Sequence, residues 1–125
     1  MINGAHFLLY SKDPEADRAF LRDVLELRSV DAGRGWLIFA LPPAEIAVHP
    51  SDEDSARDAD DGVAGASLYL MCDDLRSTMR SLEAKKASFA PVAEAQWGIV
   101  TTVALPSGAK VGLYQPKHPT AVDPR

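Results

Sequence analysis

The sequence contains a single cysteine, Cys72, so the chain cannot form an internal disulfide. One unpaired thiol is typical of proteins in reducing compartments. No apolar run approaches the about 18 residues that a membrane span needs, and the N-terminus lacks the basic, apolar and small-residue regions of a signal peptide. We therefore expect a cytoplasmic protein without a membrane partner.

The sequence also lacks a basic stripe and the short motifs of several enzyme classes. Its net charge is −5, and residues 51–62 alone, with six acids and one arginine, account for all of it. The rest of the chain is neutral, so we expect no nucleic acid partner. GxSxG, GxGxxG, phosphate-loop and CxxC patterns are all missing. Nothing therefore indicates a hydrolase elbow, a dinucleotide site or a dithiol centre.

The composition that remains is that of an ordinary globular domain. The chain has 125 residues, of which 46% are hydrophobic and 25% charged. This length predicts one domain with a single core. Its first part, residues 5–11, is short and apolar and predicts a strand. A helix follows, which Asp13 can cap and Pro14 can begin, and residues 28–49 read as three more strands.

The same order of elements then returns. Residues 66–72 predict an apolar strand, Asp73 or Asp74 can cap the next helix, and three strands follow. An apolar stripe at helical spacing in this second helix comprises Leu75, Met79 and Leu82. A repeat of about 60 residues indicates that the domain is built from two similar units.

We therefore predict an α+β fold of two paired βαβββ units that form a curved, mostly antiparallel sheet around a cleft. The units span about residues 4–49 and 65–116 of a single domain, 1–125. An acidic loop, residues 50–64, joins them and reads as a solvated linker. It does not match a calcium loop, because Arg57 stands where the first aspartate would be required.

With this organisation, the chain resembles the vicinal oxygen chelate superfamily, which comprises the glyoxalase, bleomycin-resistance and extradiol dioxygenase proteins. The resemblance lies in the opening AHFLLYSKDPEADRAFLRDVLEL, the strand and helix start YLMCDDL, and the ending LPSGAKVGLYQP. It covers nearly the whole chain through order and spacing, although Leu21 and Glu26 replace the tyrosine and glycine that the family often has. The resemblance implies a cleft that is frequently completed by a homodimer, and we expect one here.

Members of this superfamily that use a metal place its ligands on inward-facing strand positions. Carried over residue by residue, the four positions fall on His6, Ala47, Ser67 and Gly112. Only His6 is a ligand type, whereas a catalytic divalent metal normally needs three protein ligands. The resemblance therefore implies that the inherited metal site is absent.

A displaced metal site remains an alternative. Glu45 and His49 point to the same side of a strand as Ala47, and with His6 they would make a two-histidine, one-carboxylate set. Residues two apart on a strand are about 6.5 Å apart, and Glu45 to His49 is twice that. Convergence on one ion is therefore difficult, and we expect no cofactor, with a divalent metal as the less favoured alternative.

The cleft would instead be lined by aromatic, apolar and a few polar side chains. If His6 faces inward, alternation along its strand brings Tyr10 to the same side, and the second unit contributes similar faces. The candidate ligand-binding residues are His6, Tyr10, Glu45, His49, Ser67, Tyr69, Met71, Trp97 and Tyr114. Such a surface suits a flat or aromatic small molecule. By contrast, His118 lies in the tail and is expected to be exposed and inert.

We therefore expect a metal-independent small-molecule-binding protein of the glyoxalase/bleomycin-resistance type, which binds or sequesters an aromatic or otherwise flat ligand. The alternative is an enzyme: a dioxygenase, lyase or isomerase with a rebuilt metal site, or with acid–base catalysis by His6. A third interpretation is a small accessory domain that uses the fold only to dimerise.

Overall fold

The computed structural model describes residues 6–47 and 66–122, which form two helices and six strands and confirm the α+β class. The elements are α1 (Pro14–Asp23), β1 (Ser29–Asp31), β2 (Leu37–Phe39), β3 (Tyr69–Met71), α2 (Leu75–Glu83), β4 (Ala93–Ala95), β5 (Gly98–Ala104) and β6 (Lys110–Pro116). Within the described ranges, no helix is long and apolar enough to cross a membrane.

Both helices begin where the sequence predicts. The Asp13 carboxylate accepts a hydrogen bond from the Ala16 backbone N–H at 3.2 Å, and Pro14 occupies the first turn of α1. In α2, Asp74 rather than Asp73 is the N-cap, and its carboxylate accepts the N–H of residue 77 at 3.1 Å. These caps satisfy backbone donors that have no partner within the helix.

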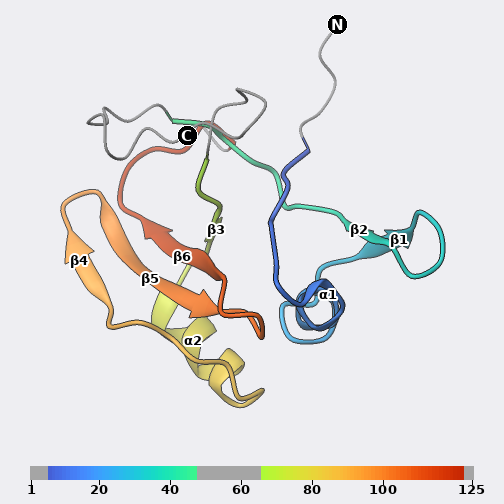
Figure 1. Cartoon of the computed structure of the whole chain (residues 1–125). Coiled ribbons are helices and arrows are strands. Elements are labelled where there is room, and N and C mark those ends of the chain that lie inside the picture. Colours follow the sequence, from blue (N-terminus) through green and yellow to red (C-terminus); the bar gives the residue numbers. More distant parts are fainter. Residues whose placement is uncertain (1–5, 48–65, 123–125) are drawn as a thin grey trace, which may run out of the picture.

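The second half of the chain builds one four-stranded sheet in the order β3-β6-β5-β4. β3 runs parallel to β6, and the other neighbours are antiparallel. In this register Tyr69 lies beside Gly112, and Val100 lies beside Tyr114. Figure 1 shows this sheet on one side of the molecule, and α1 with the β1–β2 hairpin on the other.

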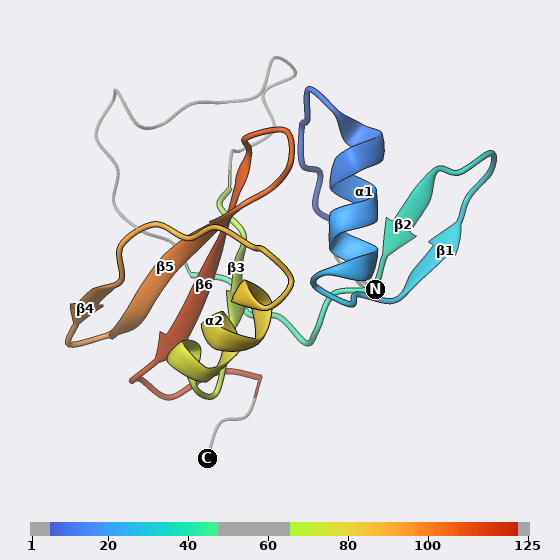
Figure 2. The same ribbon diagram turned by 90° about the horizontal axis from the view of Figure 1, so that it is seen from below.

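The core lies between α2 and this sheet. Its buried residues are Leu75, Leu82, Val103, Leu105, Val111 and Leu113. Two of the three predicted stripe residues of α2 are among them, and the third, Met79, packs against the cluster. Figure 2 shows α2 lying across one face of the sheet, so the other face is available to form a site.

A buried polar contact ties α1 to the turn between β5 and β6. Asp17 is 6% exposed, and its carboxylate accepts hydrogen bonds from the Ser107 backbone N–H at 3.0 Å and the Ser107 hydroxyl at 2.7 Å. Burial alone would raise the pKa of Asp17, but hydrogen bonds from Ser107 and Ser11 outweigh it and lower the pKa. This contact joins segments 90 residues apart.

The first unit differs from its prediction in its strands. Residues 6–11 have no strand pairing, and the side chains from Phe7 to Tyr10 are exposed. Of the three strands expected in 28–49, β1 and β2 form an isolated two-stranded sheet, and the described residues up to 47 contain no third. A strand exists through its pairing, and within the described part of this chain no neighbour pairs with residues 6–11. The acidic loop, 50–64, lies outside the described residues.

Candidate functional site

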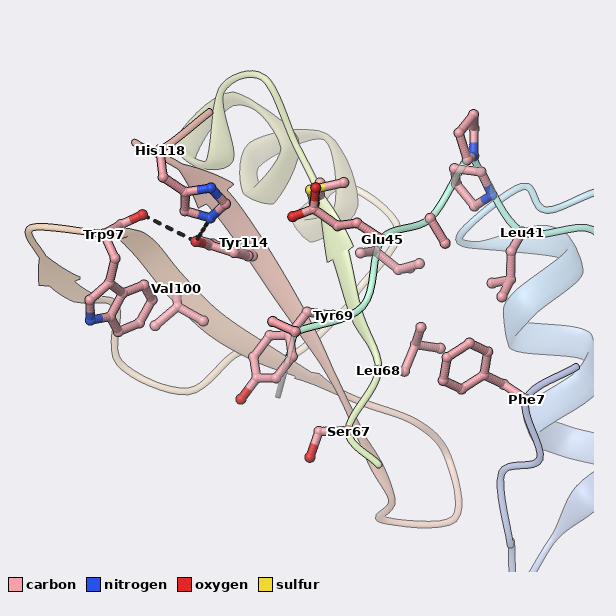
Figure 3. Close-up of a pocket in the computed structure, with 16 residues that line it drawn as sticks. Phe7, Leu41, Glu45, Ser67, Leu68, Tyr69, Trp97, Val100, Tyr114 and His118 are labelled. Carbon is pink, nitrogen blue, oxygen red and sulfur yellow. Dashed lines mark hydrogen bonds between the residues drawn. The ribbon is translucent and has the colours of Figure 1, made fainter. Parts of the chain in front are cut away.

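A cavity of about 720 Å³ lies between the free face of the four-stranded sheet and the segment 41–47 that crosses it (Figure 3). This volume is within the usual range for a small-molecule site. Its lining residues are Phe7, Leu41, Pro42, Pro43, Ala44, Glu45, Ala47, Ser67, Leu68, Tyr69, Leu70, Met71, Trp97, Val100, Tyr114 and His118. Most of these side chains are apolar or aromatic, and the polar groups are few.

Three aromatic rings form one wall of the cavity. The Tyr69 and Tyr114 ring centroids are 6.4 Å apart, with the planes at 77°, and those of Trp97 and Tyr114 are 5.7 Å apart at 74°. Both are edge-to-face arrangements, which aromatic rings favour. The Tyr69 and Trp97 side chains are about half exposed, at 48% and 52%, so their faces are open to a ligand. Figure 3 shows them on either side of Val100.

Two glycines in the sheet make room for the tyrosines. A Cβ atom at Gly112 would overlap the Tyr69 ring, and one at Gly98 would overlap the Tyr114 ring. Each ring therefore lies directly over glycine backbone, which no other residue would allow. The Tyr69 ring fills the space above Gly112.

The Tyr114 hydroxyl lies at the centre of the polar contacts. It is 3.1 Å from the Trp97 carbonyl oxygen and 2.5 Å from His118 Nε2, while His118 Nδ1 is 2.7 Å from the Pro119 carbonyl oxygen. Burial, and secondarily the negative charge of Glu45, raises the pKa of Tyr114. The phenol group therefore stays protonated in the cavity.

Glu45 connects the crossing segment to the C-terminal tail. Its Oε1 atom accepts the Ala121 backbone N–H at 2.6 Å. In Figure 3 the side chain extends towards Tyr114 and His118. Glu45 is the one carboxylate in the described lining. The lining contains no lysine or arginine, and His118 is its one basic side chain.

The structure brings most of the predicted ligand-binding residues to this cavity. Those that line it are Glu45, Ser67, Tyr69, Met71, Trp97 and Tyr114. His6 and Tyr10 are exposed and do not line it, because 6–11 is not a paired strand and Phe7 occupies the cavity instead. Tyr10 borders a smaller hollow beside the β5–β6 turn. His49 lies outside the described residues.

Sequence reasoning missed His118, which is half-buried and bonded to Tyr114 rather than exposed and inert. Strand alternation could not find it, because it follows the end of β6 on a segment that turns back over the sheet. The prolines at 116 and 119 are the signal that the chain turns there.

The inherited metal positions do not fit a metal in this fold. His6 is exposed outside the cavity, Ala47 and Gly112 offer no ligand atom, and the Tyr69 ring occupies the space above Gly112. Across residues 6–47 and 66–122, no three His, Cys, Asp or Glu side chains gather closely enough to hold an ion. A catalytic metal needs about three such ligands, so these residues do not fit one.

Solved structures with the same fold give an independent comparison. The chain aligns with a lactoylglutathione lyase from Agrobacterium tumefaciens at a TM-score of 0.61 and 20% identity, covering 90% of this chain and 92% of the other. It aligns with TnmS3, an antibiotic binding protein from Streptomyces sp. CB03234, at 0.59 and 20% identity, covering 94% and 100%.

A third structure, a member of the glyoxalase/bleomycin resistance protein/dioxygenase superfamily from Sphaerobacter thermophilus, aligns at a TM-score of 0.57 and 19% identity, covering 91% and 98%. No protein-family model matches the sequence, and no curated protein sequence matches it. The structural likenesses show that the chain has the vicinal oxygen chelate fold expected from its sequence.

Proposed function

We propose that this protein binds a flat aromatic small molecule in the cavity and sequesters it without a metal. The observation that carries the proposal is the wall of three rings, from Tyr69, Trp97 and Tyr114, two of them half exposed beside a 720 Å³ cavity. Half-exposed aromatic faces in a concave apolar site gain contact area when a planar ligand covers them. The antibiotic binding protein among the similar structures supports a binding role.

Metal independence is supported by what the polar groups already do. Glu45 Oε1 holds the tail amide of Ala121, and His118 contacts Tyr114 and Pro119 through its two ring nitrogens. A metal at His118 would have to displace its contact with Tyr114 or Pro119. His6 lies outside the cavity that would hold a substrate, which argues against acid–base catalysis by His6.

We also propose that the protein acts as a homodimer in the cytoplasm. Large apolar side chains from Phe7 to Tyr10, and Val30, Trp36 and Ile38 of the hairpin, are exposed in the single chain. A two-stranded sheet alone is only marginally stable in water. A second copy that covers these surfaces would remove the apolar area from water. The single thiol supports a reducing location.

The binding proposal can be tested with three planar probes that differ in charge: acridine, 9-aminoacridine and acridine-9-carboxylate. The chain has two tryptophans, so Trp36→Phe leaves Trp97 as the only tryptophan and Trp97→Phe leaves Trp36. We expect at least one acridine to quench Trp97 emission saturably in Trp36→Phe, with much weaker quenching in Trp97→Phe. Absence of saturable quenching for all three probes, or stronger quenching of Trp36, would contradict the proposal.

A further inference from the structure

The hydrogen bonds around Tyr114 determine which polar atoms it can offer to a ligand. A carbonyl oxygen only accepts, so the contact between Pro119 and His118 requires a proton on Nδ1 of His118. The other nitrogen, Nε2, faces the Tyr114 hydroxyl and can be protonated or not. Two arrangements follow from this.

When His118 is neutral, the Tyr114 hydroxyl donates to Nε2, and the Trp97 carbonyl keeps the Lys117 N–H at 3.0 Å as its donor. When His118 is protonated, Nε2 donates to the Tyr114 oxygen, and the hydroxyl donates to the Trp97 carbonyl at 3.1 Å. In both arrangements the phenolic proton is used within the protein. Tyr114 therefore presents only an acceptor to a ligand.

Glu45 adds a second acceptor and a negative charge. Its carboxylate forms no ion pair among the described residues, and one of its oxygens accepts the Ala121 N–H. No lysine or arginine of the described lining balances it. The faces of the Tyr69 and Trp97 rings also favour a positively charged group, because the negative face of an aromatic ring attracts cations.

We propose that the cavity selects planar aromatic ligands that carry a positively charged or hydrogen-bond-donating nitrogen, placed towards Glu45 and Tyr114. This inference rests on the proposed binding function and specifies its ligand class. A carboxylate ligand would instead meet a carboxylate, an acceptor oxygen and π faces, and it would lose its water without a compensating partner.

The test compares the dissociation constants of the same three acridines in mildly alkaline buffer, where 9-aminoacridine is cationic, acridine neutral and the carboxylate anionic. We expect wild-type protein to bind 9-aminoacridine about tenfold or more tightly than acridine-9-carboxylate, with acridine between them. In Glu45→Gln this order should collapse towards equal affinities. The glutamine keeps an oxygen for the Ala121 N–H, so the tail contact is retained.

Glu83→Gln is the matched control, because Glu83 is an exposed carboxylate at the end of α2 that does not line the cavity. It removes the same charge and should preserve the cation preference. Equal binding of all three acridines by wild type would overturn the ligand class while leaving the binding function intact. An undiminished preference in Glu45→Gln would overturn the placement of the ligand nitrogen towards Glu45. Failure of all three to bind would overturn the binding function itself.

Discussion

Asp17 is the one charged residue that is buried in the described part of the chain, and its two carboxylate oxygens hold the β5–β6 turn against α1. Two residues of the site also make defined hydrogen bonds. His118 determines where the Tyr114 proton goes, and Glu45 joins the crossing segment to the tail. Asp17 and Glu45 connect parts of the chain that are distant in sequence, whereas His118 contacts neighbours along the tail.

We predict that Asp17→Asn lowers the free energy of unfolding at neutral pH by about 1–3 kcal/mol, because a charge-assisted, buried pair of hydrogen bonds is weakened. Because folding lowers the pKa of Asp17, its carboxylate stabilises the folded state at pH values above its unfolded-state pKa of about 3.9. This stabilisation is lost as the pH falls through the folded-state pKa. Urea unfolding from neutral to acidic pH should therefore show a shallower acid loss in the variant. A wild-type acid profile in Asp17→Asn would contradict this account.

At the residue scale, site positions on paired strands could be predicted from the sequence, whereas His6 and His118 could not be placed. Tyr69, Met71 and Tyr114 lie on paired strands, where alternation determines which side chains share a face. His6 lies on a segment without pairing, so alternation gave no reliable face for it. His118 depends on a turn after β6 and required the three-dimensional path of the tail.

At the scale of elements, the four-stranded sheet is shaped by its glycines and aromatic rings together. Tyr69 lies over Gly112 on the neighbouring strand, and Tyr114 of β6 lies over Gly98 of β5. The two glycines therefore leave the room that the rings occupy. Binding by the aromatic wall depends on this packing.

We predict that Gly112→Ala destabilises the protein by about 1–3 kcal/mol, since the added methyl group overlaps the Tyr69 ring. Its backbone does not have a positive φ, so the cost comes from space and not from backbone strain. The double variant Gly112→Ala, Tyr69→Ala should remove the clash, so the alanine at 112 should cost much less there. Thermal unfolding of the wild type, the two single variants and the double variant measures the cost of the alanine in each background. Equal effects of Gly112→Ala in both backgrounds would contradict the proposed packing.

The elements that depend on local chemistry were predictable, and those that depend on distant pairing were less so. Helix starts at Asp13 and Asp74 follow from capping within four residues. Strands need a partner, and residues 6–11 have an apolar strand-like sequence without one in the described chain. The sequence pattern indicates a capacity for pairing but not where the partner lies.

At the scale of the whole molecule, the first unit leaves large apolar side chains exposed. The hairpin β1–β2 extends away from the four-stranded sheet (Figure 2), and Val30, Trp36 and Ile38 on it are exposed. Leu8 is 66% exposed on the unpaired segment 6–11. These surfaces are the ones that we expect a second copy to cover.

We predict that the protein elutes in light-scattering chromatography at twice the 13.5 kDa mass of one chain. Leu8→Asp should shift it to the monomer, because a charge would be buried at the proposed interface. Ser81→Asp, on the exposed side of α2, adds the same charge elsewhere and should leave the dimer intact. A monomeric wild type, or a Leu8→Asp dimer as tight as wild type, would contradict the proposed assembly.

The most direct test of metal-independent binding in the cavity is calorimetric titration of the tightest-binding acridine into two samples of the protein. Both samples are dialysed against chelator, and one of them then receives zinc, nickel, manganese or ferrous ions in separate titrations. We predict affinities that agree within about twofold, since the aromatic wall and Glu45 supply the binding energy. Binding that appears only after a metal is added would contradict the account.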